Sequence, residues 1–156
     1  MQAAKYKIKE VEDLIVWDEF VEKSPQGTGF SNSLYLNSCD SHYEIFFIYK
    51  GDEIKAGLCL TTEGKSARLD DLVIYNGILF PPYNPDQRKV TVDQERFEIS
   101  EYITKFVSDR YEQFETSFSP EIKDIRPFLW HNYGSKNPKE IFNYYSRNKA
   151  RQESRR

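Results

Sequence analysis

The residues whose types could do chemistry together lie closest to one another between positions 119 and 133. This stretch, SPEIKDIRPFLWHNY, places an acid, a base and three ring side chains within ten residues: Asp124, Arg126, Trp130, His131 and Tyr133. In one interpretation, the rings and the guanidinium form a patch that grips a ligand. In the other, the stretch is a buried crossing segment in which the acid and the base satisfy each other, because rings in a small domain mostly serve packing. The sequence leaves both interpretations open.

The residue types needed for nucleophilic catalysis or metal binding occur without a convincing pattern. Cys39 precedes His42 by three residues, but a nucleophile and its base need spatial proximity and a third, orienting group. Asp70 and Asp71 stand at the start of an expected strand, where capping or solvation is a simpler role than metal binding. Cys39 and Cys59 have no metal-ligand or CxxC spacing. We therefore expect no catalytic residue and no metal site.

The composition predicts one folded domain in the cytoplasm. A chain of 156 residues can build a hydrophobic core, and 15% aromatic residues favour a packed, sheet-containing domain. The net charge of −3 argues against a nucleic acid as partner. Two cysteines without a pairing pattern fit a reducing compartment, and no apolar run is long enough for a transmembrane segment.

Two helices are expected in the first quarter of the chain. Asp13 is a plausible N-cap, and apolar residues recur at helical spacing after it. The proline and glycines of residues 24–29 should end this helix, because proline cannot continue it and glycine tolerates left-handed turns. Residues 30–36 can then form a second, short helix capped by Ser31 or Asn32.

Strands are predicted to form an antiparallel meander at the centre of the domain. Residues 43–49 and 54–62 are strongly apolar and are separated by a short turn, which is typical of a hairpin. Residues 69–80 follow a second turn as the third strand. A weakly alternating strand at residues 6–11 precedes the meander.

The clearest helical pattern is predicted to begin at Asp93 and to end near residue 111. Its apolar stripe should be buried on the sheet, and the residues expected in the core are Phe97, Ile103, Phe106 and Val107.

Further strands are predicted at residues 113–118 and 141–145. Pro127 fixes its own φ and pushes Arg126 toward an extended conformation, so a continuous helix over residues 124–130 is not expected. Together these elements predict an α+β domain.

The order of the elements resembles the GNAT acyltransferase fold, in which helices flank a mixed, mostly antiparallel central sheet. Motifs within residues 17–36 (WDEFVEKSPQGTGFSNSLYL) and 124–133 (DIRPFLWHNY) together are similar to the N-terminal half of FemAB-like proteins. These are GNAT-related acyl- and aminoacyltransferases, some of which build peptidoglycan cross-bridges. The basic run near residues 146–153 resembles the linker into their second half. The resemblance implies a GNAT-like domain at residues 1–146 and a basic linker or tail at 147–156, toward a second domain.

The resemblance also implies where an acyl-CoA would be held. A working GNAT domain binds the diphosphate of acyl-CoA on backbone N–H groups of a glycine-rich loop at a helix N-terminus. The corresponding residues 81–90 contain no glycine and three prolines, which lack N–H groups, and Asp86 would repel phosphate. Arg88 and Lys89 could still attract an anion. We therefore expect that no acyl-CoA cofactor is bound in the usual GNAT way.

The acceptor-binding residues that the resemblance implies are Tyr35, Arg126, Trp130 and Tyr133. In Fem enzymes an aromatic residue near the start of the second helix helps to grip the cell-wall precursor. Tyr35 is the nearest match to that position, although the more usual tryptophan is absent. The alternative role for all four residues is packing and hydrogen bonding inside the domain.

Three functions remain open. The first is the acceptor-side half of a FemAB-like acyl- or aminoacyltransferase, inactive alone, whose partner is a second GNAT-like domain or another copy of the chain. The second is a stand-alone binding module whose basic tail holds a polyanion through Arg147, Lys149 and Arg151, with an affinity that falls steeply with salt. The third is a single-domain acetyltransferase, against which the glycine-free loop counts.

Overall fold

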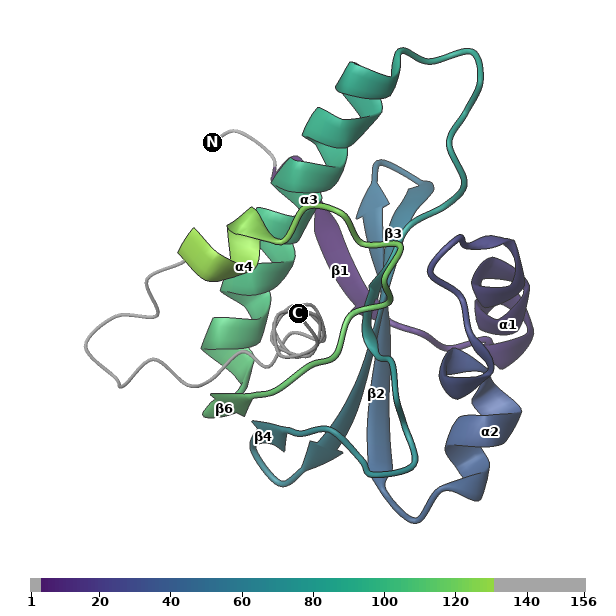
Figure 1. Ribbon diagram of the computed structural model, residues 1–156, viewed down its shortest axis with the longest axis vertical. Helices are drawn as coiled ribbons and strands as arrows, with labels where there is room; N and C mark the ends of the chain where they lie inside the picture. Colours follow the sequence, from purple (N-terminus) through teal and green to yellow (C-terminus); the bar gives the residue numbers. More distant parts are fainter. Residues whose placement is uncertain (1–3, 131–156) are drawn as a thin grey trace, which may run out of the picture.

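The computed structural model describes residues 4–130, which fold around one mixed sheet (Figure 1). Its strands are β1 (Lys7–Glu10), β2 (His42–Lys50), β3 (Glu53–Glu63), β4 (Ser66–Ala67), β5 (Gly77–Leu79) and β6 (Gln113–Phe114). The helical elements are α1 (Leu14–Lys23), the 3-10 turn η1 (Gly29–Ser31), α2 (Ser33–Ser38), α3 (Lys89–Arg110) and α4 (Arg126–Trp130). The strand order is β1-β2-β3-β4-β6, and β5 also pairs with β3. Among these pairs only β4–β6 is parallel. The predicted α+β class with a mostly antiparallel sheet is confirmed.

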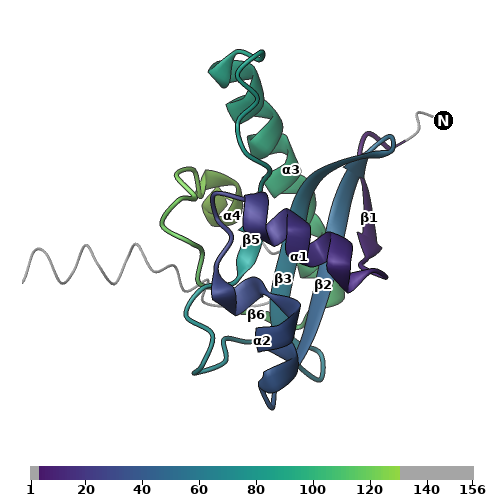
Figure 2. The same cartoon turned by 90° about the vertical axis from the view of Figure 1, so that its right-hand side faces the viewer.

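Helices cover both faces of the sheet (Figures 1 and 2). The helices α1 and α2 lie on one face, and α3 and α4 lie on the other. Neighbouring residues of β2 serve the two faces in turn, as a pleated strand requires. Phe47 packs in the cluster that contains Trp17 of α1, and Ile48 packs in the cluster that contains Ile103 of α3. The sheet therefore separates two apolar cores.

The predicted hairpin is present as β2 and β3. These strands pair from His42↔Thr62 to Lys50↔Glu53, and Gly51 takes a φ of 60° in the turn between them. That left-handed conformation is one that glycine adopts without the penalty of a side chain. The hairpin is the longest pairing in the described sheet and carries the other elements.

Both helices expected in the first quarter are present. Asp13 caps α1 as predicted, because its Oδ1 accepts a hydrogen bond from Ile15 N at 2.9 Å. Trp17 is fully buried on the sheet, and its Nε1 donates to Ser31 O at 2.8 Å. Asn32 caps the short α2. The indole hydrogen bond ties α1 to the turn that precedes α2.

The predicted single strand over residues 69–80 is wrong. The chain leaves the edge of β3 after β4 and rejoins the same edge at β5, so residues 68–76 form a loop between them. Asp70 accounts for part of this departure. Its Oδ1 accepts from Leu72 N at 2.7 Å and its carbonyl accepts from Val73 N at 3.0 Å. This local turn takes the place of the sheet ladder.

The strand predicted over residues 113–118 is also shorter, and only β6 forms. Beyond β6, Glu115 N still donates to Ala67 O at 2.8 Å, and Asn76 binds the residues that follow. Asn76 Oδ1 accepts from Thr116 Oγ1 at 2.7 Å and from Ser117 N at 3.0 Å, and Asn76 N donates to Ser117 O at 2.8 Å. The strand predicted at residues 141–145 lies outside the described residues.

The helix α3 begins at Lys89, one turn before the predicted start at Asp93. Arg88 occupies the cap position without a side-chain capping bond, and its carbonyl accepts from Thr91 N at 3.0 Å. The carboxylate of Asp93 instead accepts a hydrogen bond from the Tyr83 hydroxyl. An acidic residue suits the first helical turns as well as the cap, which explains why the sequence placed the start too late.

The buried face of α3 agrees with the prediction only in part. Ile103 and Val107 are fully buried, as expected. Phe97 and Phe106 are only half-buried, which corrects the prediction that they belong to the core. Phe106 packs edge-on against Phe46, with 5.2 Å between the ring centres. The apolar stripe is therefore wider than the face that meets the sheet.

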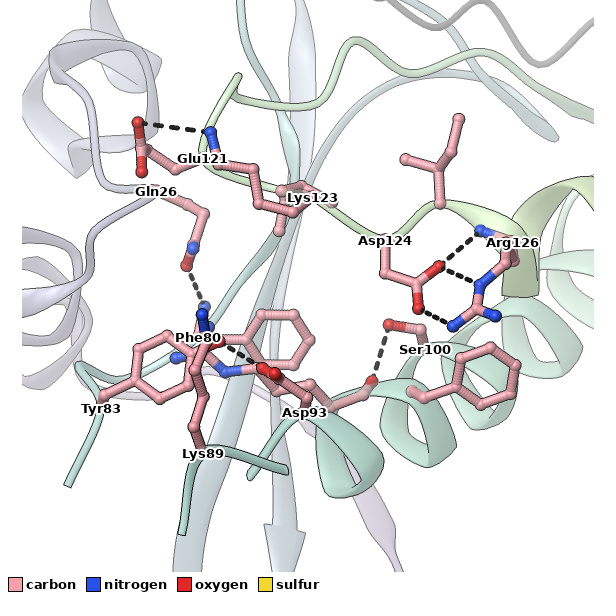
Figure 3. A pocket seen from close by; sticks show the side chains of 14 residues that line it. Gln26, Phe80, Tyr83, Lys89, Asp93, Ser100, Glu121, Lys123, Asp124 and Arg126 are labelled. Carbon is pink, nitrogen blue, oxygen red and sulfur yellow. Dashed lines mark hydrogen bonds and ion pairs between the residues drawn. The ribbon is translucent and has the colours of Figure 1, made fainter. Parts of the chain in front are cut away.

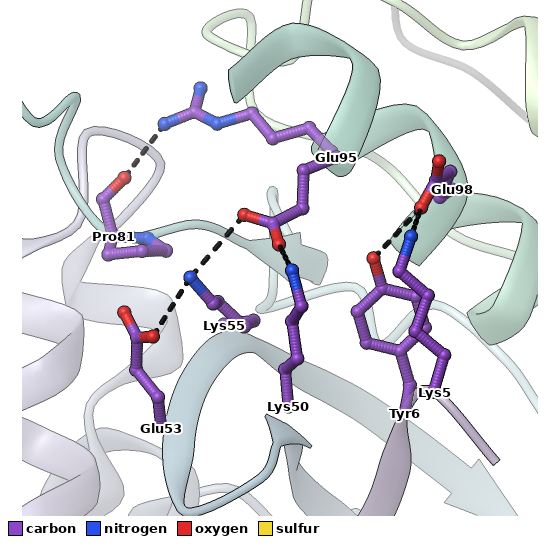
Figure 4. A network of polar contacts seen from close by, with 9 residues as sticks. Lys5, Tyr6, Lys50, Glu53, Lys55, Pro81, Glu95 and Glu98 are labelled. Carbon is purple, nitrogen blue, oxygen red and sulfur yellow. Dashed lines mark hydrogen bonds and ion pairs between the residues drawn. The ribbon is translucent and has the colours of Figure 1, made fainter. Parts of the chain in front are cut away.

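Polar contacts fasten the first half of α3 to the sheet (Figure 4). Glu95 accepts from Lys50 Nζ at 2.7 Å and lies 3.4 Å from Lys55 Nζ, so it bridges both strands of the hairpin. Glu98, one turn later, accepts from the Tyr6 hydroxyl at 3.1 Å and pairs with Lys5. These contacts fix the rotation of α3 about its axis.

The helix α4 begins at Arg126, a residue predicted to be extended. Asp124 Oδ1 accepts from Arg126 N at 3.1 Å, which satisfies a donor of the first turn. Pro127 stands in this first turn, where a missing N–H removes no helical hydrogen bond. The predicted discontinuity over residues 124–130 thus falls just before Arg126.

Candidate functional site

An open cavity of about 540 Å³ lies between the first half of α3 and the segment that leads into α4 (Figure 3). The chain after β5 closes a third side with Phe80 and Tyr83. Its volume falls within the range of small-molecule sites. The charged residues of the wall are the bases Lys89, Arg96, Lys123 and Arg126 and the acids Asp93, Glu121 and Asp124. The wall therefore carries an excess of one positive charge in a chain whose net charge is −3.

Arg96 projects from α3 onto two aromatic rings. Its guanidinium carbon lies 4.0 Å from the centre of the Tyr83 ring and 4.9 Å from that of Phe80. One of its terminal nitrogens donates to Pro81 O at 2.7 Å. Burial lowers the pKa of Arg96, and nearby Tyr83 and Asp93 oppose this effect. The side chain therefore holds a partly desolvated positive charge beside the cavity.

Tyr83 connects the loop to the first turns of α3. Its hydroxyl donates to the carboxylate of Asp93, and its ring centre lies 6.0 Å from Lys89 Nζ. Burial and the bond to Asp93 raise the pKa of Tyr83. The phenol therefore remains a hydrogen-bond donor at neutral pH, and its ring lies next to the Arg96 guanidinium.

The opposite wall contains the acid and base that the sequence singled out. Arg126 Nε donates to Asp124 Oδ1 at 2.8 Å, and a terminal nitrogen donates to Oδ2 at 2.5 Å. This bond to Arg126 holds the pKa of Asp124 below its usual range. The guanidinium carbon of Arg126 also lies 5.3 Å from the centre of the Phe97 ring on α3. The acid and the base thus satisfy each other, as one interpretation expected, and they line the cavity, whereas ligand binding by this stretch stays a prediction.

Gln26 reaches the cavity from the loop after α1. It is only 4% exposed, and its Oε1 accepts from Phe80 N at 2.8 Å and from Ser24 Oγ at 3.3 Å. The loop turns sharply at Gly27, where an added Cβ would lie 1.8 Å from Val21 O. Glycine at this position therefore allows the chain to bring Gln26 beneath Phe80.

Two backbone donors of the loop that enters α3 are used inside the loop. Asp86 N donates to Asn84 Oδ1 at 2.9 Å, and Gln87 N donates to Asn84 O at 3.1 Å. Pro81, Pro82 and Pro85 have no N–H group. Five of the ten positions 81–90 therefore have no backbone donor to offer, and the loop lacks the glycines of an anion-binding cradle.

Tyr35, the residue predicted to bind an acceptor, lies far from this cavity. It belongs to α2, which covers the other face of the sheet. Its hydroxyl donates to Leu72 O at 2.6 Å, and its ring packs edge-on against Phe30 with 5.4 Å between centres. The structure therefore brings Arg126, and not Tyr35, to the cavity.

The remaining predicted site residues fall outside what the structure describes. Trp130 is placed as the last residue of α4, but its side chain is not described. Tyr133 and the anion-binding candidates Arg147, Lys149 and Arg151 lie beyond residue 130, as does the expected linker.

The thiol and the imidazole near α2 do not form a nucleophile–base pair. His42 Nδ1 lies 2.9 Å from Thr62 Oγ1, and burial, with Asp70 nearby, raises the pKa of Cys39. A thiol with a raised pKa is a poor nucleophile. Within residues 4–130, no group of three His, Cys, Asp or Glu side chains is arranged to hold a metal ion. No helix in the same part of the chain has the length and apolar content to cross a membrane.

Known proteins were compared with the chain at the levels of family, sequence and structure. Comparisons with family models, curated proteins and solved structures found no match. A role for the cavity therefore has to be inferred from its own chemistry.

Three residues that shape the cavity carry no clear signal in the sequence. From the sequence, Gln26 is expected in a turn and Phe80 at the end of a strand. Arg96 is expected to be a polar residue on the exposed face of a helix. Their convergence depends on the packing of α3 against the chain after β5. The nearest sequence signal is the adjacent proline-rich loop, because a rigid loop before a long helix often shapes a site.

Proposed function

We propose that this chain is the acceptor-side half of a FemAB-like acyl- or aminoacyltransferase and that it does not catalyse transfer alone. The element order and the motifs within residues 17–36 and 124–133 support the resemblance. The observation that carries the proposal is the loop before α3, which has no glycine, three prolines without N–H groups and two N–H groups that donate within the loop. A domain whose loop is poorly suited to cradle the diphosphate of acyl-CoA fits the half that receives the acceptor and leaves donor binding to its partner.

The cavity supplies a plausible contact for a polar acceptor. It has charged groups on both walls and aromatic rings at its base, which suits a molecule with polar groups along an apolar body. Arg126 is the predicted acceptor-binding residue that lies there. In the proposed enzyme this half would bind and orient the acceptor, while the second domain would supply the activated acyl group.

Exposed apolar side chains offer a surface for the second domain or for another copy of the chain. Leu34 on α2 is 79% exposed, and Leu72 and Ile74 in the facing loop are 62% and 53% exposed. The hydrogen bond from Tyr35 to Leu72 O holds this loop against α2. Large apolar side chains that gather on a surface commonly mark an interface.

Titration calorimetry with acetyl-CoA tests the proposal. We expect no binding tighter than about 1 mM, which corresponds to a binding free energy of only about −4 kcal/mol. A known single-domain acetyltransferase titrated in the same buffer serves as the positive control. Micromolar binding by the isolated chain would reject the acceptor-side role and would favour a single-domain acetyltransferase.

A further inference from the structure

The side chain of Gln26 presents an amide donor to the cavity. The residue is 4% exposed and lines the cavity wall. Because Oε1 accepts from a backbone N–H, that of Phe80, the orientation of the amide is determined by its surroundings. No acceptor for Nε2 exists among residues 4–130. The nitrogen is not itself sealed from the cavity, so it can donate to an acceptor that enters.

Two cations near Gln26 also form no ion pair with the described residues. Neither Lys89 nor Arg96 forms an ion pair within the described part of the chain. They stand seven residues apart on α3, which is two helical turns, and both lie against the Tyr83 ring. Arg96 has five N–H donors and gives one hydrogen bond, to Pro81 O. The cavity thus combines a free amide donor with a guanidinium that has donors to spare.

The floor of the cavity is apolar. The rings of Phe80 and Phe97 and the side chains of Ile122 and Ile125 line it. Phe80 touches both polar elements, since its N–H binds Gln26 and its ring lies under Arg96. A ligand that satisfies the whole wall must therefore have an apolar body and an anionic end.

We propose that this cavity binds a small organic carboxylate. Its carboxylate oxygens accept from Arg96 and from Gln26 Nε2, and its apolar body lies on Phe80 and Phe97. A carboxylate matches the planar guanidinium edge. Asp93 and Glu121 also line the cavity and disfavour a doubly charged phosphate. This binding needs no second domain and no acyl transfer, so it stands or falls independently of the proposed function.

Ligand titrations followed by NMR chemical shifts test the class of ligand. The probes are N-acetyl-phenylalanine, its neutral amide and phenyl phosphate, which share a ring and differ in the polar end. We expect the carboxylate to bind at least about tenfold more tightly than the amide and more tightly than the phosphate. Equal affinity for the amide, tighter binding of the phosphate, or no shifts at about 10 mM carboxylate would each overturn the proposal.

Substitutions locate the contact. Gln26→Glu keeps an oxygen for Phe80 N but replaces the free donor by a negative charge, and Arg96→Gln removes the guanidinium. Each should weaken carboxylate binding by about tenfold or more. Lys105→Gln, on the exposed side of the same helix, is the matched control and should leave the affinity unchanged.

Thermal melts separate lost binding from lost folding. If Arg96→Gln melts early, exposed Lys89→Gln replaces it, with an expected loss of about threefold. Unchanged affinity in folded Gln26→Glu and Lys89→Gln proteins would show that the ligand binds elsewhere. The acetyl-CoA titration remains a separate result, because a chain that binds carboxylates can still fail to bind acyl-CoA.

Discussion

The guanidinium of Arg96 lies over the ring of Tyr83, 4.0 Å from its centre. This contact joins α3 to the proline-rich loop that precedes it, and the hydrogen bond from Arg96 to Pro81 O reinforces the junction. Arg96 and Tyr83 both line the cavity, so the stability of the loop and the shape of the cavity depend on the Arg96 side chain.

Replacing Arg96 by alanine should lower the free energy of unfolding by about 2 kcal/mol. The substitution removes a cation–π contact and a charged hydrogen bond from a half-buried site. Urea unfolding followed by circular dichroism measures the change. Lys105→Ala, on the exposed face of α3, should change stability by less than about 0.5 kcal/mol. Equal effects of the two substitutions would contradict the structural role of Arg96.

Ile103 should matter more to stability than Phe106, although phenylalanine is the larger residue. Ile103 is fully buried, so Ile103→Ala should cost about 3 kcal/mol. Phe106 is half-buried, so Phe106→Ala should cost less than the 3–5 kcal/mol or so typical of a core phenylalanine. Parallel urea titrations rank the two variants. The reverse order would mean that the apolar stripe of α3 is buried differently.

Gly57 on β3 should not tolerate alanine. An added Cβ would lie 2.9 Å from ring carbons of both Trp17 and Phe20, so α1 would have to move away from the sheet. We expect Gly57→Ala to cost about 1–3 kcal/mol and to change the near-ultraviolet circular dichroism of Trp17. Gly29→Ala is the matched control, because nothing lies within 4 Å of its added Cβ. A neutral Gly57→Ala would disprove this close packing.

Glu44 should make stability depend on pH. Burial raises the pKa of Glu44, whereas hydrogen bonds from Arg110 and Tyr111 lower it. The lowering is larger than the rise, so the pKa lies below the ordinary value. The ionised form is therefore favoured by folding. Its stabilisation is present above the ordinary pKa of the carboxyl and is lost as the pH falls through the lowered value.

Glu44→Gln tests this dependence. The variant should be less stable than the wild type at neutral pH, and its stability should fall less steeply between about pH 6 and about pH 3. Unfolding in urea at a series of pH values provides the comparison. Glu101→Gln, an exposed position on α3, should reproduce the wild-type slope. A Glu44→Gln slope as steep as that of the wild type would reject the linkage.

Local sequence signals predicted the elements whose structure is decided locally. The cap at Asp13, the hairpin around Gly51 and the end of α3 near residue 111 all depend on neighbours in the chain. The strand over residues 69–80 failed because Asp70 forms a turn and Asn76 binds a segment forty residues away. Apolar periodicity cannot reveal such side-chain competition for backbone groups.

Only some of the residues that line the cavity could be recognised from the sequence. Asp124 and Arg126 were recognised because a close acid and base stand out among aromatic residues. Gln26 and Arg96 were missed, because a glutamine in a turn and an arginine on a helix look like ordinary surface residues until the fold brings them to Phe80. These two residues shape the cavity only because tertiary packing buries them, and such packing cannot be predicted from local sequence patterns.

The walls of the cavity come from three distant parts of the chain, at residue 26, at residues 80–100 and at residues 121–126. Contacts between such distant segments form late in folding, because each requires a long loop to close first. The hairpin of β2 and β3 can form early from local contacts, whereas the cavity arises only when the chain after β6 docks on α3. Partly folded chains would therefore already have most of the sheet but no binding site. A ligand would then bind only the fully folded chain and would not stabilise the transition state for folding. It should therefore slow unfolding more than it speeds folding.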